Sequence, residues 1–140
     1  MTAFPNPLAE EIWADRYRFV APGGAAEPSI DATWARVARV LAAVEPEARP
    51  TWEGRFLDAL ADFRFLPGGR ILAGAGTGRR VTLCNCFVMG TIEDTLDGIF
   101  RALHEGALTM QQGGGIGYDY STLRPAGEPA DTTGGVASGP

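Results

Sequence analysis

The sequence contains no lysine, because all 12 of its basic residues are arginine. A phosphate-binding loop of the G-x-x-x-x-G-K-[ST] type is therefore excluded, since that motif depends on its lysine. Any phosphate contact from a basic side chain has to come from arginine, whose planar guanidinium can hold two phosphate oxygens at once. Base composition in a GC-rich genome produces the same bias, so the missing lysine alone does not indicate a function.

Cysteine and histidine are scarce, with two cysteines and one histidine in 140 residues. Two cysteines do not form the disulfide scaffold that is typical of small secreted proteins. A complete zinc site needs about four ligands, and Cys84, Cys86 and His104 supply too few. The sequence also lacks a Ser-His-Asp pattern or paired carboxylates. We therefore expect no metal site and no hydrolase centre.

Long apolar runs are missing too. No stretch approaches the roughly 20 residues that a membrane span needs, and the opening MTAFPNPLAEE lacks the basic start and apolar core of a signal peptide. The net charge of −5 argues against nucleic acid as a partner, because that needs a basic surface. We expect a cytoplasmic protein without a membrane partner. The acidic charge does not exclude the binding of single nucleotides, because a few arginines in one pocket suffice to hold their phosphates.

Helical periodicity dominates the first half, within residues 7–19, 29–46 and 51–67. In the second segment, apolar residues recur at alternating spacings of four and three, which predicts an amphipathic helix capped by Ser29 and ended by Pro46. Thr51 is expected to cap the third helix. The apolar faces expected to be buried contain Leu8, Ile12 and Phe19, then Ile30, Trp34, Val37, Leu41 and Val44, then Trp52, Phe56, Ala59 and Phe63.

The composition changes at Pro67, where a glycine-rich segment with a loop-like pattern begins. Residues 81–89, VTLCNCFVM, predict a buried strand. A helix is expected next, capped by Asp94, with Asp97 approximating a capping box and Gly113 as its stop. A second, glycine-rich strand follows before Pro125. The helix face expected to be buried contains Leu96, Ile99, Phe100, Leu103, Ala107 and Met110.

This order predicts an α/β protein in two regions, with helices in residues 1–66 and the start of an α/β domain in residues 67–140. Strand, helix and strand in the second region are typical of one crossover unit. Two strands do not make a stable sheet by themselves. The second region therefore looks like part of a larger sheet.

The two cysteines occupy the C-x-C stretch CNC at residues 84–86. Burial is the ordinary state of a free cysteine, and the spacing favours it. A disulfide within the pair is disfavoured, because alternate Cα atoms of a strand lie roughly 6.5–7 Å apart, at the limit of disulfide geometry.

The glycine cluster QQGGGIG, residues 111–117, does not fit the dinucleotide fingerprint, because it follows a helix instead of opening one. Two interpretations stay open, close packing of helix against strand or backbone N–H groups presented to an anion. Arg79, Arg80 and Arg124 lie near the ends of the predicted strands, where each could contact a phosphate or line a solvated rim.

Long blocks resemble the catalytic chain of ribonucleotide reductases, in particular the adenosylcobalamin-dependent class. They are FLPGGRILAGAGT, NCFVMGTIEDTLDGIF, ALTMQQGGGIGYDYSTLRP and ASGP, and NPLAEEIWADRYR is similar to the family's opening. The resemblance implies an N-terminal helical region followed by a ten-stranded α/β barrel of two five-stranded halves, of which this sequence covers the first strand-helix-strand elements.

The resemblance also implies an activity, the reduction of ribonucleoside diphosphates to deoxyribonucleoside diphosphates by thiyl-radical chemistry. Adenosylcobalamin would generate the radical in the complete enzyme, through contacts that do not lie in this sequence. The implied partners are a ribonucleotide substrate, a deoxynucleotide effector, a thioredoxin-type reductant, and a second copy or the remaining reductase chain. The family chemistry uses three cysteines, so we expect these 140 residues alone to be inactive.

Site residues follow from the same resemblance. Cys86 matches the first cysteine of the reducing pair, whereas Cys84 stands where the family has an apolar residue. Substrate contacts are implied for Asn85, Gly114 and Gly115, and effector contacts for Asp94, Thr95, Leu96 and Arg124. Two alternatives stay open, the large subunit of the diiron-dependent class and a free-standing nucleotide-binding or interaction module.

Overall fold

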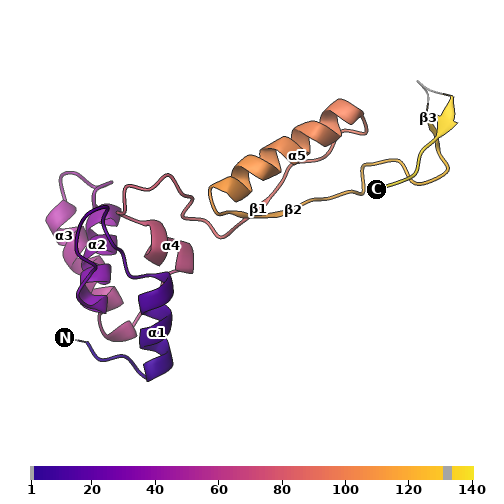
Figure 1. Ribbon diagram of the computed structural model, residues 1–140. Coiled ribbons are helices and arrows are strands. Elements are labelled where there is room, and N and C mark those ends of the chain that lie inside the picture. Colours follow the sequence, from indigo (N-terminus) through magenta and orange to yellow (C-terminus); the bar gives the residue numbers. More distant parts are fainter. Residues whose placement is uncertain (1, 131–133) are drawn as a thin grey trace. The chain divides into compact units, whose positions relative to one another are not determined.

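The computed structural model describes residues 2–130 and 134–140 of the chain (Figure 1). The chain divides into two compact units, Met1–Cys84 and Asn85–Pro140. The boundary that the sequence predicts between residues 66 and 67 falls inside the first unit. Helices make up the first unit, and the second contains one long helix with short strands.

The first unit confirms the three predicted helices. Its elements are α1 (Pro7–Arg16), α2 (Ile30–Ala42), α3 (Arg49–Leu60), the short turn η1 (Ala61–Phe63) and α4 (Gly69–Gly74). Asn6 caps α1, because its side chain accepts a 2.9 Å hydrogen bond from the backbone N–H of Ala9. The expected cap of α3 is wrong, since α3 begins before Thr51. Residues 69–74 were expected to lie in a loop, but they form helix α4. In so glycine-rich a segment, a single short helix differs from a loop only in its short-range turns.

The core of the first unit surrounds α2. Ile30, Trp34 and Val37 are buried as predicted, and Val44 lies beyond the end of the helix with 79% of its surface exposed. In α1 the buried residue is Trp13, whereas Leu8 and Ile12 are exposed, so the face predicted for this helix is wrong. In α3 Leu60 is buried, while Ala59 is exposed and the aromatic side chains are half-buried.

A hydrogen-bond network connects α1 and α2 through the carboxylate of Glu27. The indole N–H of Trp13 donates to the hydroxyl of Thr33 over 2.9 Å, and that hydroxyl donates to Glu27 Oε2 over 2.6 Å. Arg36 Nε donates to Glu27 Oε1 over 2.7 Å, and both side chains of this ion pair are about nine-tenths buried. Buried polar groups that are fully paired in this way specify one arrangement of the surrounding helices.

The stability of the first unit is expected to fall in acid because of Glu27. Burial alone would raise the pKa of this carboxyl, but hydrogen bonds from Arg36, Thr33 and the Phe19 backbone, with the charge of Arg36, lower it below the ordinary 4.5. A depressed pKa in the folded state stabilises above the unfolded pKa and stops doing so as pH falls through the folded value. Urea unfolding from pH 6 downward should show this loss below about pH 4.5. Glu27→Gln should reduce the loss of unfolding free energy between pH 6 and lower pH. A loss as large as that of the unaltered chain would contradict the role given to Glu27.

The second unit is built on two short parallel strands beside one helix. β1 (Cys86–Val88) pairs in parallel with β2 (Gly115–Gly117), and α5 (Leu96–Gln111) connects them and lies alongside in Figure 1. β3 (Pro129–Ala130) and β4 (Gly135–Val136) form an antiparallel pair. The crossover unit is confirmed. The prediction of a long buried strand over residues 81–89 is wrong, because β1 spans three residues and Val88 is 95% exposed.

Helix α5 differs from its prediction at its cap and on its buried face. Thr95 is the N-cap, since its hydroxyl accepts a 3.0 Å hydrogen bond from the N–H of Gly98. Asp94 does not cap the helix, and Asp97 pairs with Arg101 instead of completing a capping box. Every residue expected on the buried face is exposed: Leu96, Ile99, Phe100, Leu103, Ala107 and Met110.

Candidate functional site

The structure brings Asn85, Cys86, Gly114 and Gly115 together, although about 30 residues separate the two pairs in sequence. Cys86 lies opposite Gly115 in the register of β1 and β2. The carbonyl of Asn85 accepts a 2.8 Å hydrogen bond from the N–H of Gly115. Cys86, implied as a reducing cysteine, and the three residues implied for substrate contacts are therefore neighbours on one end of the parallel strand pair.

The thiol of Cys86 is exposed, and the glycine beside it keeps it uncovered. A Cβ atom at Gly115 would lie 3.2 Å from Cys86 Sγ, closer than ordinary van der Waals contact. A side chain there would crowd the sulfur, so Gly115 leaves space for another molecule to approach. An accessible sulfur is what thiol exchange or hydrogen transfer needs.

Cys84 lies outside the strand pair. It is exposed, and its backbone N–H donates to the hydroxyl of Thr82 over 3.0 Å. Burial was predicted for both cysteines from their spacing, and it is wrong for both. The reason is that the apolar run around them forms only a three-residue strand, in which Phe87 is half-buried while Cys86 and Val88, on the other side of the strand, are exposed.

The glycine cluster serves close packing. The N–H groups of Gly113, Gly114 and Gly115 donate to the carbonyls of Met110, Thr109 and Asn85, so they are occupied within the chain. A Cβ at Gly114 would meet Phe87 at 2.8 Å and Thr109 at 2.9 Å. Gly113, at φ 89°, ends α5 as expected. Of the two open interpretations, the packing of helix against strand is the one these contacts support.

The second group of implied residues gathers at the start of α5. Arg124 Nε donates to Asp94 Oδ2 over 2.7 Å, across 30 residues of sequence. Thr95 is engaged as the N-cap, and Leu96 is 75% exposed. The hydroxyl of Thr122 donates to the carbonyl of Ile92 over 2.6 Å, which holds the segment before Arg124 against the segment before Asp94.

Sequence reasoning missed the face of α5 that packs on the strands. Gly98 and Gly106 are the buried residues of this helix. The hydroxyl of Tyr118, just after β2, donates to the carbonyl of Ala102 over 2.9 Å. Gly106 was the available signal, because a glycine inside a helix permits the close approach of another segment. Gly98 instead lies against Glu93 and Thr95 at the start of the helix.

Gly106→Ala is expected to destabilise the packing of α5 on β2. The new Cβ would lie 1.9 Å from the hydroxyl oxygen of Tyr118 and 2.8 Å from Ile116, so the tyrosine has to leave Ala102. Overpacking of this kind costs about 1–3 kcal/mol. Gly54→Ala in α3 is the matched control, because nothing lies within 4 Å of its Cβ, and it should stabilise by about 1 kcal/mol. The change in stability of each helix can be measured by amide hydrogen exchange. Equal changes in the two variants would contradict the close packing of α5 on β2.

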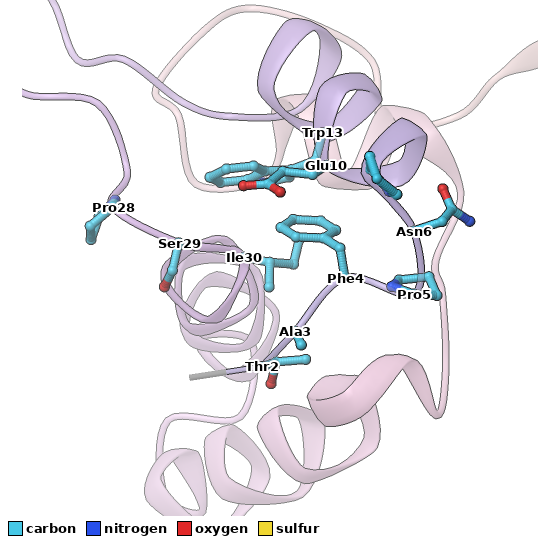
Figure 2. A pocket seen from close by; sticks show the side chains of 11 residues that line it. Thr2, Ala3, Phe4, Pro5, Asn6, Glu10, Trp13, Pro28, Ser29 and Ile30 are labelled. Carbon is cyan, nitrogen blue, oxygen red and sulfur yellow. The ribbon is translucent and has the colours of Figure 1, made fainter.

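The first unit contains a hollow of about 520 Å³ beside the start of α1 and α2 (Figure 2). The rings of Phe4 and Trp13 line it with centroids 5.5 Å apart, and Glu10 contributes a carboxylate. Its described lining residues include no cysteine, histidine or arginine, so it offers neither a thiol nor a cation to a nucleotide. It is therefore not part of the candidate site.

Among the described residues, no group of three or more His, Cys, Asp or Glu side chains lies together as a metal site would require. In the same part of the chain, no helix combines the length and the apolar character that a membrane crossing needs.

Comparison with protein families matches the two halves of the chain separately. Residues 3–80 match the family described as "Ribonucleotide reductase, all-alpha domain", and residues 84–140 match "Ribonucleotide reductase, barrel domain". The two matches meet close to the division between the compact units at Cys84 and Asn85.

Individual relatives agree with the family match. A vitamin B12-dependent ribonucleoside-diphosphate reductase of Mycobacterium tuberculosis (strain CDC 1551 / Oshkosh) is 38% identical over 136 residues, which is 94% of this chain and 19% of that protein. The Thermoplasma acidophilum protein of the same name is 38% identical over 86 residues, 61% of this chain and 11% of that protein. The ribonucleoside-diphosphate reductase subunit alpha of Chlamydia pneumoniae is 32% identical over 106 residues, which is 76% of this chain and 10% of that protein.

The chain thus spans about a fifth of the length of the mycobacterial relative and about a tenth of the others. Within that length the match is continuous from the helical unit into the strand-helix-strand unit. The chain belongs to the ribonucleotide reductase family, with the all-alpha domain followed by the start of the barrel domain.

Proposed function

We propose that the chain is the N-terminal portion of an adenosylcobalamin-dependent ribonucleoside-diphosphate reductase that makes deoxyribonucleotides for DNA synthesis. The observation that carries the proposal is the exposed Cys86, set against Gly115 on the strand pair, in a chain that matches B12-dependent relatives over 94% of its length. We place the enzyme in the cytoplasm.

In this proposal Cys86 is one of two thiols that reduce the ribose. A thiyl radical removes the 3′-hydrogen, the 2′-hydroxyl leaves as water, and the two thiols supply two electrons and become a disulfide. A thioredoxin-type reductant then restores both thiols. The sequence has two cysteines, and Cys84 lies outside the strand pair, so the partner thiol and the radical cysteine belong to other parts of the reductase.

Asn85, Gly114 and Gly115 form the substrate side of the site. The pairing of β1 with β2 sets Gly115 against the sulfur of Cys86, with Asn85 and Gly114 next to these two residues in the chain, and the absent side chain at residue 115 leaves room for the ribose. Asp94, Thr95, Leu96 and Arg124 form the effector side, at which a deoxynucleoside triphosphate selects the substrate base. Arg124 is the residue of that group that can pair with phosphate.

Adenosylcobalamin supplies the initial radical in this class of reductase. The described residues of this chain do not fit it. Two hollows among the described residues measure about 520 and 120 Å³, within or below the roughly 300–1,000 Å³ of pockets for drug-sized ligands, and a corrinoid is larger than such a ligand. The cofactor is therefore held by the rest of the reductase.

The exposed face of α5 supports a partner for this chain. Phe100 is 63% exposed and Leu103 is 54% exposed, in a row with Leu96 and Met110. Apolar surface of this extent is typical of a protein interface. A second copy of the chain or the remaining reductase chain would cover it, and the open edges of β1 and β2 would accept further barrel strands.

The experiment that tests the proposal compares cofactors in the full-length reductase that carries this sequence. With CDP and a dithiol, dCDP should form when adenosylcobalamin is added, and the 140-residue chain alone should form none. The relative from Chlamydia, named as a subunit alpha without mention of vitamin B12, favours a second candidate, the large subunit of the diiron-dependent class. Formation of dCDP without cobalamin, in the presence of a radical-generating small subunit, would select that candidate.

A further inference from the structure

Arg124 has every nitrogen of its guanidinium engaged within the chain. Nε donates to Asp94 Oδ2 over 2.7 Å, Nη2 donates to the Asp94 carbonyl over 3.3 Å, and Nη1 donates to the Pro129 carbonyl over 3.0 Å. Phosphate is held best by two parallel N–H groups on one side of the guanidinium. That side, Nε with Nη2, is occupied by Asp94.

Cations that could replace Arg124 are scarce in the second unit. Residues 85–140 contain two arginines and no lysine, against seven Asp and Glu residues, so this half carries the whole net charge of −5. The other arginine, Arg101, is paired with Asp97 on the outer side of α5. An anion that binds this unit has to pair with Arg124, because the surrounding carboxylates otherwise repel it.

The ion pair can be opened. The side chains of Arg124 and Asp94 keep 33% and 35% of their surface exposed. Ion pairs at this level of exposure contribute little net stability, because water solvates both partners after separation. A ligand with several negative charges therefore competes well against one carboxylate for the same guanidinium.

We propose that Asp94 occupies the phosphate position of Arg124 in the ligand-free chain and is displaced by the phosphates of an effector. The inference rests on the proposed function, since it assigns a regulatory role to the same effector residues. Displacement frees the Asp94 carboxylate to accept a hydrogen bond from the ligand. It also releases the contact between residue 94 and the segment that leads into β3, so ligand binding loosens one contact of the chain while it forms another.

Inorganic tripolyphosphate is the probe that tests this exchange, because it presents phosphates without sugar or base. In calorimetry at low ionic strength, where the Debye length is long, Asp94→Asn should bind it about five-fold more tightly than the unaltered 140-residue chain. Asp94→Ser also removes the carboxylate and should give the same gain. Circular dichroism verifies that both variants are folded.

Asp97→Asn is the matched control. It removes one negative charge from the same helix and frees Arg101, so it reproduces the change in net charge without opening Arg124. Its affinity for tripolyphosphate should stay within about two-fold of the unaltered chain. An equal gain in this variant, no gain in Asp94→Asn, or no binding by any of the chains would overturn the inference.

A titration with dTTP separates this inference from the effector site itself. Binding of dTTP by the unaltered chain, with no gain for tripolyphosphate in Asp94→Asn, would overturn the exchange and leave the effector site standing. A gain for tripolyphosphate, with dTTP bound no better than tripolyphosphate, would support the exchange and contradict the effector site.

Discussion

Arg36→Met is expected to lower the free energy of unfolding of the first unit by about 3–5 kcal/mol. The substitution keeps an unbranched, flexible stem but shortens the side chain and removes the charge that is paired with the nine-tenths buried carboxylate of Glu27. A buried ion left without its partner is among the most destabilising changes in a protein. The Arg36 guanidinium also donates to the carbonyls of Leu72, over 3.0 Å, and Ala75, so the end of α4 loses its donors as well.

Arg39→Met is the control for this prediction. Arg39 lies one turn further along α2 and pairs with Glu53 over 3.4 Å, but its side chain is 62% exposed. Exposed pairs contribute about 0–1 kcal/mol, so this variant should unfold close to the unaltered chain. All three tryptophans, at positions 13, 34 and 52, lie in the first unit, and their fluorescence in urea therefore reports on this unit alone. Equal midpoints for the two variants would contradict the network.

Cys86→Ser in the full-length reductase is expected to abolish repeated turnover with a dithiol reductant. A serine hydroxyl cannot supply the electron that the thiol supplies, so the reducing pair cannot form its disulfide. Cys84→Ser should keep most of the activity, because Cys84 lies outside the strand pair that holds Cys86 beside Gly115. Rates of dCDP formation measure both variants.

The two substitutions control each other, since they make the same chemical change two residues apart on exposed side chains. Similar activities, whether both are lost or both are kept, would contradict the separate roles. Far-UV circular dichroism of each variant confirms that the comparison is made between folded proteins.

Local patterns predicted the helices well because helix formation depends on neighbours in sequence. The spacing of Ile30, Trp34 and Val37 located the buried stripe of α2, and Gly113 located the end of α5. The same patterns gave the wrong side of α5. They show which residues are apolar, but they do not show whether the strands of the same chain or another partner will cover them.

Contacts between distant segments could not be predicted from local pattern. Asp94 has the residue type and position of a helix cap, yet it pairs with Arg124, and Thr95 caps the helix. Trp13 is buried because it reaches Thr33 on another helix. For the site residues, the family resemblance supplied the candidates, and the structure showed that they gather into two groups of neighbours.

If Cys86 delivers electrons to the ribonucleotide, the oxidation of its thiol can be counted directly. The full-length reductase is reduced, freed of dithiol, supplied with adenosylcobalamin and one equivalent of CDP, and then alkylated for peptide mass spectrometry. Alkylation of Cys86 should fall in proportion to the dCDP formed, while Cys84 stays fully alkylated. Formation of dCDP with Cys86 still fully alkylated would contradict the account.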